Sequence, residues 1–228
     1  MKCKLPRNLA LVLAGFVMAL AAGEGKAQLT LASGADAEVS EDGLHRIDRS
    51  VMIGAWVKPN LNLSGYRKIF FMPTLVVFRD LDDGQVNQFS VGIDEIYPVT
   101  DAQQANIRDM FGEALHDSIS NIDAYELTEQ VGRDVLLVQG RLLDMISAVP
   151  PDISGSRVVS SIRWAWEATV LIEIRDSMSD EVLARTVERQ RAEGPIAVND
   201  VSVLTPRLID NWARHLARNV QELSELAR

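Results

Sequence analysis

Three consecutive residues, His116, Asp117 and Ser118, are the residue types of a serine hydrolase triad. In a triad the nucleophile, the base and the orienting acid point toward one another. These three lie in a segment with helical spacing, where neighbours point about 100 degrees apart, so they cannot converge. Ser118 also falls on the apolar stripe of that helix. We interpret the three residues as one turn of a structural helix.

An acidic run formed by Asp80, Asp82 and Asp83 precedes Gly84 and has some features of a calcium-binding loop. An EF-hand loop needs glycine at its sixth position and glutamate at its twelfth. Here glycine stands at the fifth position, and Val91 takes the place of the glutamate. Asp-Gly is a favoured turn pair, so the run predicts a turn. Weak calcium binding outside the EF-hand pattern is the alternative.

The histidines predict no metal site. His45, His116 and His215 are the three histidines, and none has a second histidine or a cysteine at ligand spacing. We interpret His116 and His215 as surface residues. The sequence contains no glycine-rich phosphate loop and no G-x-S-x-G or S-x-x-K motif. We therefore expect no metal, no cofactor and no nucleotide chemistry.

Two carboxylates, Glu167 and Glu173, are the residue types of an acid and base pair. Six residues of one predicted strand separate them, which is about 20 Å at the rise of a strand. Glycosidases hold their paired carboxyl groups within roughly 5 to 9.5 Å of each other. The pair therefore does not predict an enzyme.

Trp164 and Trp166 open a long apolar run in which residues alternate between two faces. Because they are two residues apart on a strand, they are predicted to share a face. An aromatic floor for a lipid, a glycan or a peptide is one interpretation. The same face continues with Ala168, Val170 and further aliphatic residues, so we favour the interpretation that both tryptophans belong to the core.

A stretch rich in proline and glycine, residues 147 to 160, leads into this strand and predicts a long exposed connection. Arg157 and Arg163 bring positive charge to it, and Ile153 offers apolar contact. Loops of this length inside compact domains are commonly functional or disordered. If the protein has a recognition surface, we place it where this loop meets Trp164, as a small mixed patch; a solvated loop without a role is the alternative.

The elements around these residues predict an α+β fold with a mixed, largely antiparallel sheet and two helices packed on one face. A capping box formed by Thr100 and Gln103 opens the first helix, and Thr205 with Pro206 is predicted to open the second, whose core face includes Trp212. Strands are predicted at residues 50–57, 66–78 (bent at Pro73, or with Pro73 at a sheet edge), 89–97, 124–129, 135–146, 164–175 and 182–191. They form one domain, residues 51 to 228, after a flexible lead-in, residues 28 to 50.

The first residues predict export. A basic start, residues 2 to 7, precedes an uncharged apolar run, residues 9 to 22, which is shorter than the roughly 20 residues needed to cross a bilayer. Small residues at Gly25 and Ala27 predict a signal peptide, residues 1 to 27, cleaved after Ala27, with cleavage after Gly23 as the alternative. The single cysteine, Cys3, precedes the apolar run, so we expect a soluble periplasmic chain without a lipid anchor.

The chain is acidic, with a net charge of −9 at pH 7. Loss of residues 1 to 27 would remove four basic residues and one acidic residue, which leaves −12. Such a chain repels nucleic-acid phosphates and anionic lipid headgroups, so neither is expected as a general partner. No stretch after residue 27 is apolar enough to span a membrane.

The chain resembles a bacterial family named domain of unknown function 3313 (DUF3313), whose members are mostly envelope lipoproteins. The resemblance covers residues 50 to 226 and rests on the segments YRKIFFMPTLVV, DVLLVQGRLLDM, WEATVLIEIRDSMSDEVLART and LIDNWARHLARNV. Its most specific part is Glu167, Glu173, Asp176 and Ser177. The missing lipidation cysteine departs from the family pattern. The resemblance implies an envelope compartment and the fold, and it carries no catalytic residues.

We favour a non-enzymatic accessory protein of the bacterial envelope that acts through contact with envelope proteins. The alternative is a periplasmic protein that binds a small lipid, glycan or peptide against the tryptophan end of the sheet. The least favoured hypothesis is a hydrolase.

Overall fold

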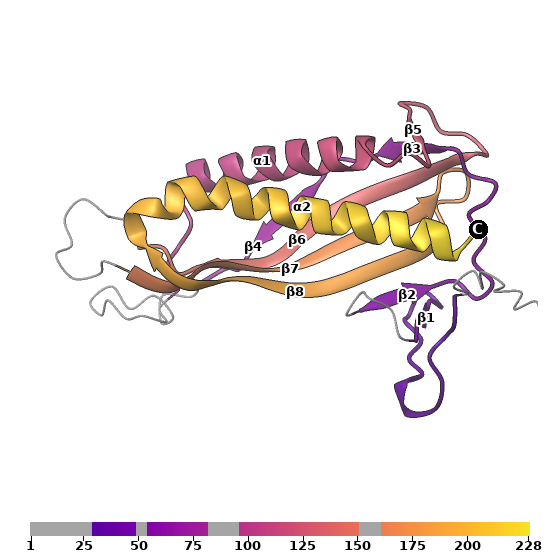
Figure 1. Ribbon diagram of the computed structural model, residues 1–228, viewed down its shortest axis with the longest axis horizontal. Helices are drawn as coiled ribbons and strands as arrows, with labels where there is room; N and C mark the ends of the chain where they lie inside the picture. The colour runs from indigo at the N-terminus through magenta and orange to yellow at the C-terminus, as the bar shows by residue number, and fades with distance from the viewer. Residues whose placement is uncertain (1–28, 49–53, 82–95, 151–160) are drawn as a thin grey trace, which may run out of the picture.

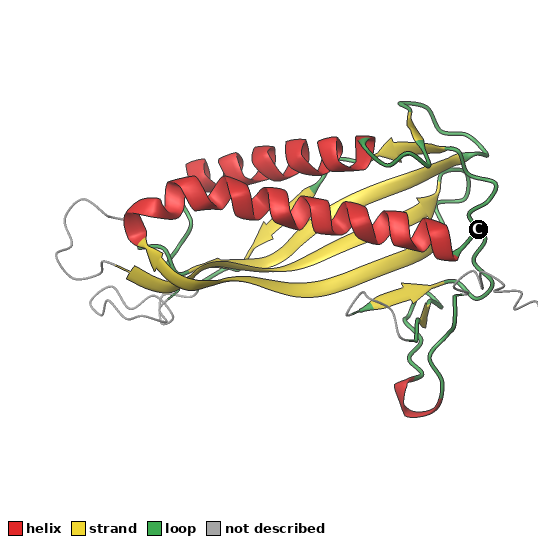
Figure 2. Ribbon diagram, viewed as in Figure 1, coloured by secondary structure: helices red, strands yellow, loops and turns green. Residues whose placement is uncertain are grey.

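The computed structural model describes residues 29–48, 54–81, 96–150 and 161–228. It has two layers, a broad sheet and a pair of helices that lie side by side across one face of the sheet (Figures 1 and 2). None of the helices in these ranges is both long and apolar enough to cross a membrane. The strands are β1 (His45–Arg46), β2 (Ala55–Val57), β3 (Lys68–Phe71), β4 (Leu75–Phe78), β5 (Glu126–Leu127), β6 (Val135–Ser147), β7 (Ser161–Asp176) and β8 (Val182–Ala197), the helices are α1 (Asp101–Ser120) and α2 (Val201–Leu226), and the short 3-10 helices are η1 (Gly34–Asp36) and η2 (Val198–Asp200).

Three long antiparallel strands, β6, β7 and β8, form the centre of the sheet. The strand order is β1-β2-β8-β7-β6-β3-β5, and β4 also pairs with β6. β3 and β4 both run parallel to β6, and β5 runs parallel to β3. The predicted α+β fold, with a mixed and largely antiparallel sheet and two helices, is confirmed.

The helix α1 begins where its sequence predicts. The Thr100 hydroxyl accepts a hydrogen bond from the Gln103 amide at 3.3 Å, and the Gln103 side chain accepts one from the Thr100 amide at 3.0 Å. This reciprocal capping box satisfies two amides that have no partner inside the helix. The buried residues of α1 are spaced four apart and face the sheet; they are Ile107, Phe111, Leu115 and Ile119.

The helix α2 begins five residues earlier than predicted. Val201 is its first residue, so Thr205 is not the N-cap and Pro206 lies inside the helix. The Thr205 hydroxyl instead donates to the Val201 carbonyl at 2.8 Å and is buried. Burial of both Val201 and Thr205 stabilises the additional turn, which local capping signals cannot reveal. The prediction that Trp212 faces the core is confirmed.

Two other expectations need correction. The single strand predicted from Tyr66 to Phe78 is two short strands, β3 and β4, with the break at residues 72–74 around Pro73, which has no amide to donate. The lead-in is not irregular where the structure describes it, because β1 pairs with β2 and Leu44 is fully buried. The predicted strand at 89–97 falls mostly outside the described residues, although Tyr97 forms a bridge with Ser147.

A close contact between layers fixes how α1 lies on the sheet. Gly140 on β6 faces the helix, and a Cβ atom added there would lie 2.0 Å from Cδ2 of Leu115. Leu115 is fully buried, so its side chain fills the space that glycine leaves on the strand. A side chain at this position would therefore force Leu115 to move, so the preference for glycine comes from packing and not from backbone conformation.

Candidate interaction surfaces

Trp166 lies on the helix-covered face of the sheet, with its side chain in the main core. Its indole N–H donates a hydrogen bond to Thr205 Oγ1 at 2.9 Å. Because Thr205 in turn donates to the Val201 carbonyl, the indole is held against the first turns of α2. The prediction that this tryptophan belongs to the core agrees with its exposure of 4%.

The indole also forms one wall of a small groove between the N-terminal ends of α1 and α2. The groove has a volume of about 250 Å³. Asn106 on α1 and Ser202 on α2 are exposed and lie at its rim. Its apolar walls come from Ile107, Met110, Val149, Trp166, Val201 and Pro206. The groove is therefore suited to apolar side chains, with polar groups from Gln103, Asn106, Ser202 and Thr205 beside its apolar walls.

Trp164 does not share the face of Trp166. The register between β7 and β8 shifts on both sides of Trp164, and its side chain packs with Ile146 and Ala148 in a separate cluster. Arg191 lies over its ring, with the guanidinium carbon 5.2 Å from the centroid. The prediction of a shared face was wrong because strict alternation assumes an unbroken ladder, and a bulge turns a side chain to the other face.

The predicted recognition patch is described only in part. Ile153 and Arg157 lie outside the described residues. Arg163 is exposed near the start of β7, while Trp164 and Trp166 are buried on opposite faces. Among the described residues of the predicted patch, Trp166 lines a hollow that faces solvent.

Glu173 is buried on the sheet face that the helices leave open, with 1% of its side chain exposed. Three arginines surround its carboxylate, with N–O distances of 2.6 Å to Arg175, 2.7 Å to Arg185 and 3.3 Å to Arg141. Asp42, from the segment before β1, contacts Arg185 as well. This cluster joins β6, β7 and β8 and ties the N-terminal segment to them.

Glu167, which precedes Glu173 on β7, is also buried and is contacted by arginines. Arg189 and Arg191 on β8 contact its two carboxylate oxygens. Asp144 at a bulged position of β6 then pairs with Arg189 at 3.3 Å and also contacts Arg79. Charges on four segments therefore form one connected network.

The ionisation of these two carboxylates is fixed by their neighbours. Burial acts to raise the pKa of Glu173, but hydrogen bonds from Arg185 and Arg175 outweigh it and hold that pKa below its usual value. Burial also acts to raise the pKa of Glu167, but hydrogen bonds from Arg191 and Arg189 outweigh it and lower that pKa. A general acid needs a pKa raised toward the working pH, and both shifts run in the opposite direction. The arrangement suits a structural role.

Sequence reasoning identified the two glutamates but missed their partners. On β8, Arg185 lies directly across from Glu173, and Arg191 directly across from Glu167. The signal was present in the sequence, because arginines recur at alternate positions of the returning strand. Opposite charges that face each other across an antiparallel pair stabilise it.

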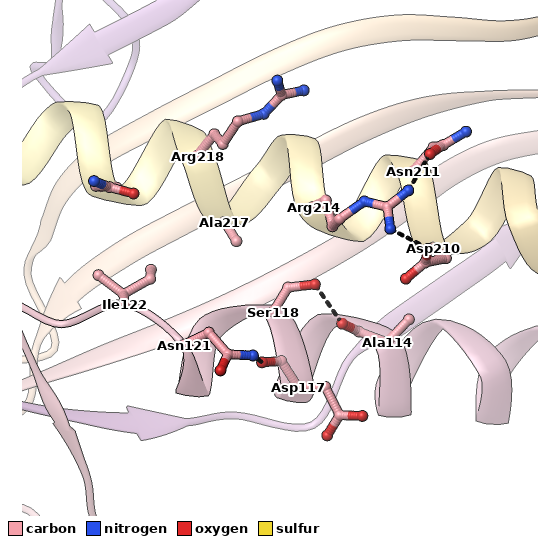
Figure 3. Close-up of a pocket in the computed structure, with 11 residues that line it drawn as sticks. Ala114, Asp117, Ser118, Asn121, Ile122, Asp210, Asn211, Arg214, Ala217 and Arg218 are labelled. Atoms are coloured by element: carbon pink, nitrogen blue, oxygen red, sulfur yellow. Dashed lines mark hydrogen bonds and ion pairs between the residues drawn. The ribbon is translucent and has the colours of Figure 1, made fainter.

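A larger hollow, of about 660 Å³, lies between the C-terminal end of α1 and the middle of α2 (Figure 3). Small side chains form its floor, including those of Ala114 and Ala217. Ser118 lies in this hollow, and its hydroxyl donates to the Ala114 carbonyl at 2.7 Å. That bond leaves Ser118 as part of a helical turn, as predicted for the triad-like residues.

The histidines occupy separate environments. The ring of His116 packs edge-on against Phe71, with centroids 5.7 Å apart. His215 is not a plain surface residue, because its Nε2 lies 2.5 Å from a carboxylate oxygen of Glu188 and the side chain is half-buried. Within the ranges that the structure describes, no three His, Cys, Asp or Glu side chains are grouped to hold a metal ion.

No family model matches this chain, and no curated protein matches it. Among solved structures, it is similar to an uncharacterised Xanthomonas campestris protein of family DUF330 (10% identity, 73% of this chain and 89% of that chain, TM-score 0.43). It is also similar to the PelC dodecamer from Paraburkholderia phytofirmans (11% identity, 76% and 94%, TM-score 0.33). A third is a neuraminyllactose-binding hemagglutinin homolog from Helicobacter pylori (6% identity, 72% and 86%, TM-score 0.35). At these scores the likenesses assign no function to the chain.

Proposed function

We propose that this chain is an exported, non-enzymatic accessory protein of the bacterial envelope that acts by binding another protein in the periplasm. The observation that carries the proposal is the apolar groove between the N-terminal ends of α1 and α2, with Trp166 in its wall. The basic start and apolar run of residues 1 to 27 support export, and the resemblance to DUF3313 supports the envelope compartment.

The size of the groove favours a protein partner. Pockets that enclose a small organic ligand usually measure roughly 300 to 1,000 Å³. At about 250 Å³, this groove holds one or two apolar side chains of a larger partner. Burial of one such side chain contributes about 1.5 to 3 kcal/mol, so the groove would serve as an anchor within a wider contact.

A second candidate function is the binding of a small lipid, glycan or peptide. The apolar walls and the indole of Trp166 favour this alternative, because an acyl chain or an apolar peptide side chain fits the same chemistry. A hydrolase is disfavoured, because Glu167 and Glu173 are saturated by arginines and held in their ionised forms.

In-cell photocrosslinking tests the proposal. A photoreactive phenylalanine replaces Asn106 at the rim of the groove, and in a control it replaces Met178, which is exposed in the turn between β7 and β8. We expect a discrete adduct with another envelope protein from position 106 and none from position 178. The same adducts from both positions, or none from position 106, would contradict a partner at the groove. Adducts with lipid or glycan instead of protein would favour the second candidate.

A further inference from the structure

The outer surface of the helix layer carries two parallel ridges of opposite charge. The acidic ridge is Asp109, Glu113 and Asp117 on α1, which are exposed and spaced four residues apart, so that they line up along the helix. Each of them follows a buried residue of the core stripe by two positions, which places it about 200 degrees around the helix and away from the sheet. The buried residues concerned are Ile107, Phe111 and Leu115.

The basic ridge lies on α2 and consists of Arg207, Arg214 and Arg218. All three are exposed, and they follow buried residues by two positions in the same way. Those buried residues are Thr205, Trp212 and Leu216. In Figure 3 the side chain of Asp117 points away from α2, and that of Arg218 points away from α1. The two ridges therefore run along the two flanks of the groove.

The ridges do not neutralise each other within the chain. Arg214 contacts Asp210 on its own helix at 2.6 Å, and Asp117 lies 3.7 Å from its neighbour His116. In the described part of the chain, no ion pair joins a residue of α1 to a residue of α2. Both ridges are thus available to charges that another molecule brings.

The two helices run in the same direction (Figure 1). The positions of the two ridges along the helices can be compared from the residues that line the same hollow. Met110 and Pro206 line one hollow near the N-terminal ends. Further along, Asp117 and Arg214 line the next hollow. Acidic and basic residues therefore lie at corresponding heights along the two helices.

We propose that a second copy of this chain docks on the helix face, related to the first by a two-fold axis that runs along the groove between α1 and α2. Such a rotation preserves the direction and the level of each helix and places α1 of one copy over α2 of the other. Asp109 of one copy then lies near Arg207 of the other, and Asp117 lies near Arg214. Because the contact is isologous, each pair occurs twice.

A second copy is the occupant that these observations favour, because it carries both ridges at the same levels. The helix face measures about 30 Å by 20 Å, which is roughly 600 Å² per copy and near the lower range of stable interfaces. Small residues in the larger hollow between the helices, Ala114 and Ala217, allow close approach. The dimer is expected to be of modest affinity and sensitive to salt. It would compete with a partner for the groove beside Trp166.

A charge-swap experiment tests this second site independently of the proposed function. One variant carries Asp109→Lys with Asp117→Lys, and the other carries Arg207→Glu with Arg214→Glu, so that both proposed pairs are reversed. Sedimentation of the purified protein at about 100 µM and about 50 mM salt should show a dimer. Its dissociation constant should rise about ten-fold at about 500 mM salt. Each variant alone should be a monomer, because its ridges then have like charges. An equimolar mixture of the two should form a heterodimer.

Circular dichroism and thermal melting establish that both variants fold. A monomeric wild-type protein, a variant that self-associates as the wild-type protein does, or a mixture that stays monomeric would each overturn the proposal. In the photocrosslinking experiment, an adduct of the chain with itself would support the dimer and not a separate partner.

Discussion

The indole N–H of Trp166 on β7 donates a hydrogen bond to Thr205 Oγ1 on α2, and both groups are buried. This bond joins the sheet to the first turns of α2 at the wall of the apolar groove. Replacement of Thr205 by Val should destabilise the fold by about 1 to 3 kcal/mol, because the buried N–H would lose its partner. Thr205→Ser keeps the hydroxyl and should cost less. Urea denaturation of both variants measures the difference, and equal losses would show that the bond contributes nothing.

The packing of α1 on β6 gives a second prediction. Gly140→Ala should destabilise the fold by about 1 to 3 kcal/mol, because the new methyl group overlaps the buried side chain of Leu115. Leu115→Ala is itself destabilising, since it leaves a cavity. In the double variant the added methyl group occupies part of that cavity. A double-mutant cycle should therefore show a smaller loss than the sum of the single variants, whereas simple additivity would show that the two residues do not compete for space.

The arginine cluster around Glu173 gives a prediction about pH. Because the folded state lowers the pKa of this carboxyl group, its contribution to stability is present above the unfolded pKa of about 4.3 and is lost as the pH falls through the folded value. Glu173→Gln should cost roughly 3 kcal/mol at pH 7, since three guanidinium groups lose their counter-charge. The difference in the free energy of unfolding between the wild-type protein and Glu173→Gln should become smaller below about pH 4.

Glu193→Gln is the matched control, because Glu193 is exposed and lies 3.9 Å from Arg191. Exposed pairs of this kind contribute little to stability. Denaturation curves across pH 3 to 8 measure all three proteins. If the loss of unfolding free energy in Glu173→Gln did not change with pH, the ionised carboxylate of Glu173 would not be the source of that stability.

Much of the fold could be predicted from the sequence, because local signals and the tertiary structure agree. The capping box of Thr100 and Gln103 and the spacing of the apolar residues located α1 correctly. The start of α2 could not be predicted, since burial of Val201 extends the helix beyond the local signal of Thr205 and Pro206. Long-range packing decided that boundary.

The candidate surfaces were less predictable. Trp166 was recognised as a core residue at the loop end of the sheet, but its groove depends on α1 and α2, which approach each other only in the folded chain. The bulges beside Trp164 gave no sequence signal and reversed its face. The partners of Glu167 and Glu173 depend on the register of β8, which alternation alone does not fix.

Export makes a separate prediction. The chain should be recovered from the periplasmic fraction with its N-terminus at Gln28, because the charge, length and small residues at positions 2 to 27 fit a signal peptide. N-terminal sequencing after fractionation measures this directly, and cleavage after Gly23 would still support export. An uncleaved or lipid-modified chain in the membrane fraction would contradict it.

The most direct measurement of the central claim is recovery of the partner after crosslinking of intact cells, with the wild-type chain compared with two variants on one helix. Asn106→Arg places a long charged side chain at the rim of the groove, whereas Ala105→Arg places it on the neighbouring exposed position outside the residues that line the groove. We predict that one envelope protein co-purifies in near-stoichiometric yield with the wild-type chain and with Ala105→Arg, and that Asn106→Arg loses it. Equal recovery with both variants, or no specific protein with any of the three, would contradict binding at the groove beside Trp166.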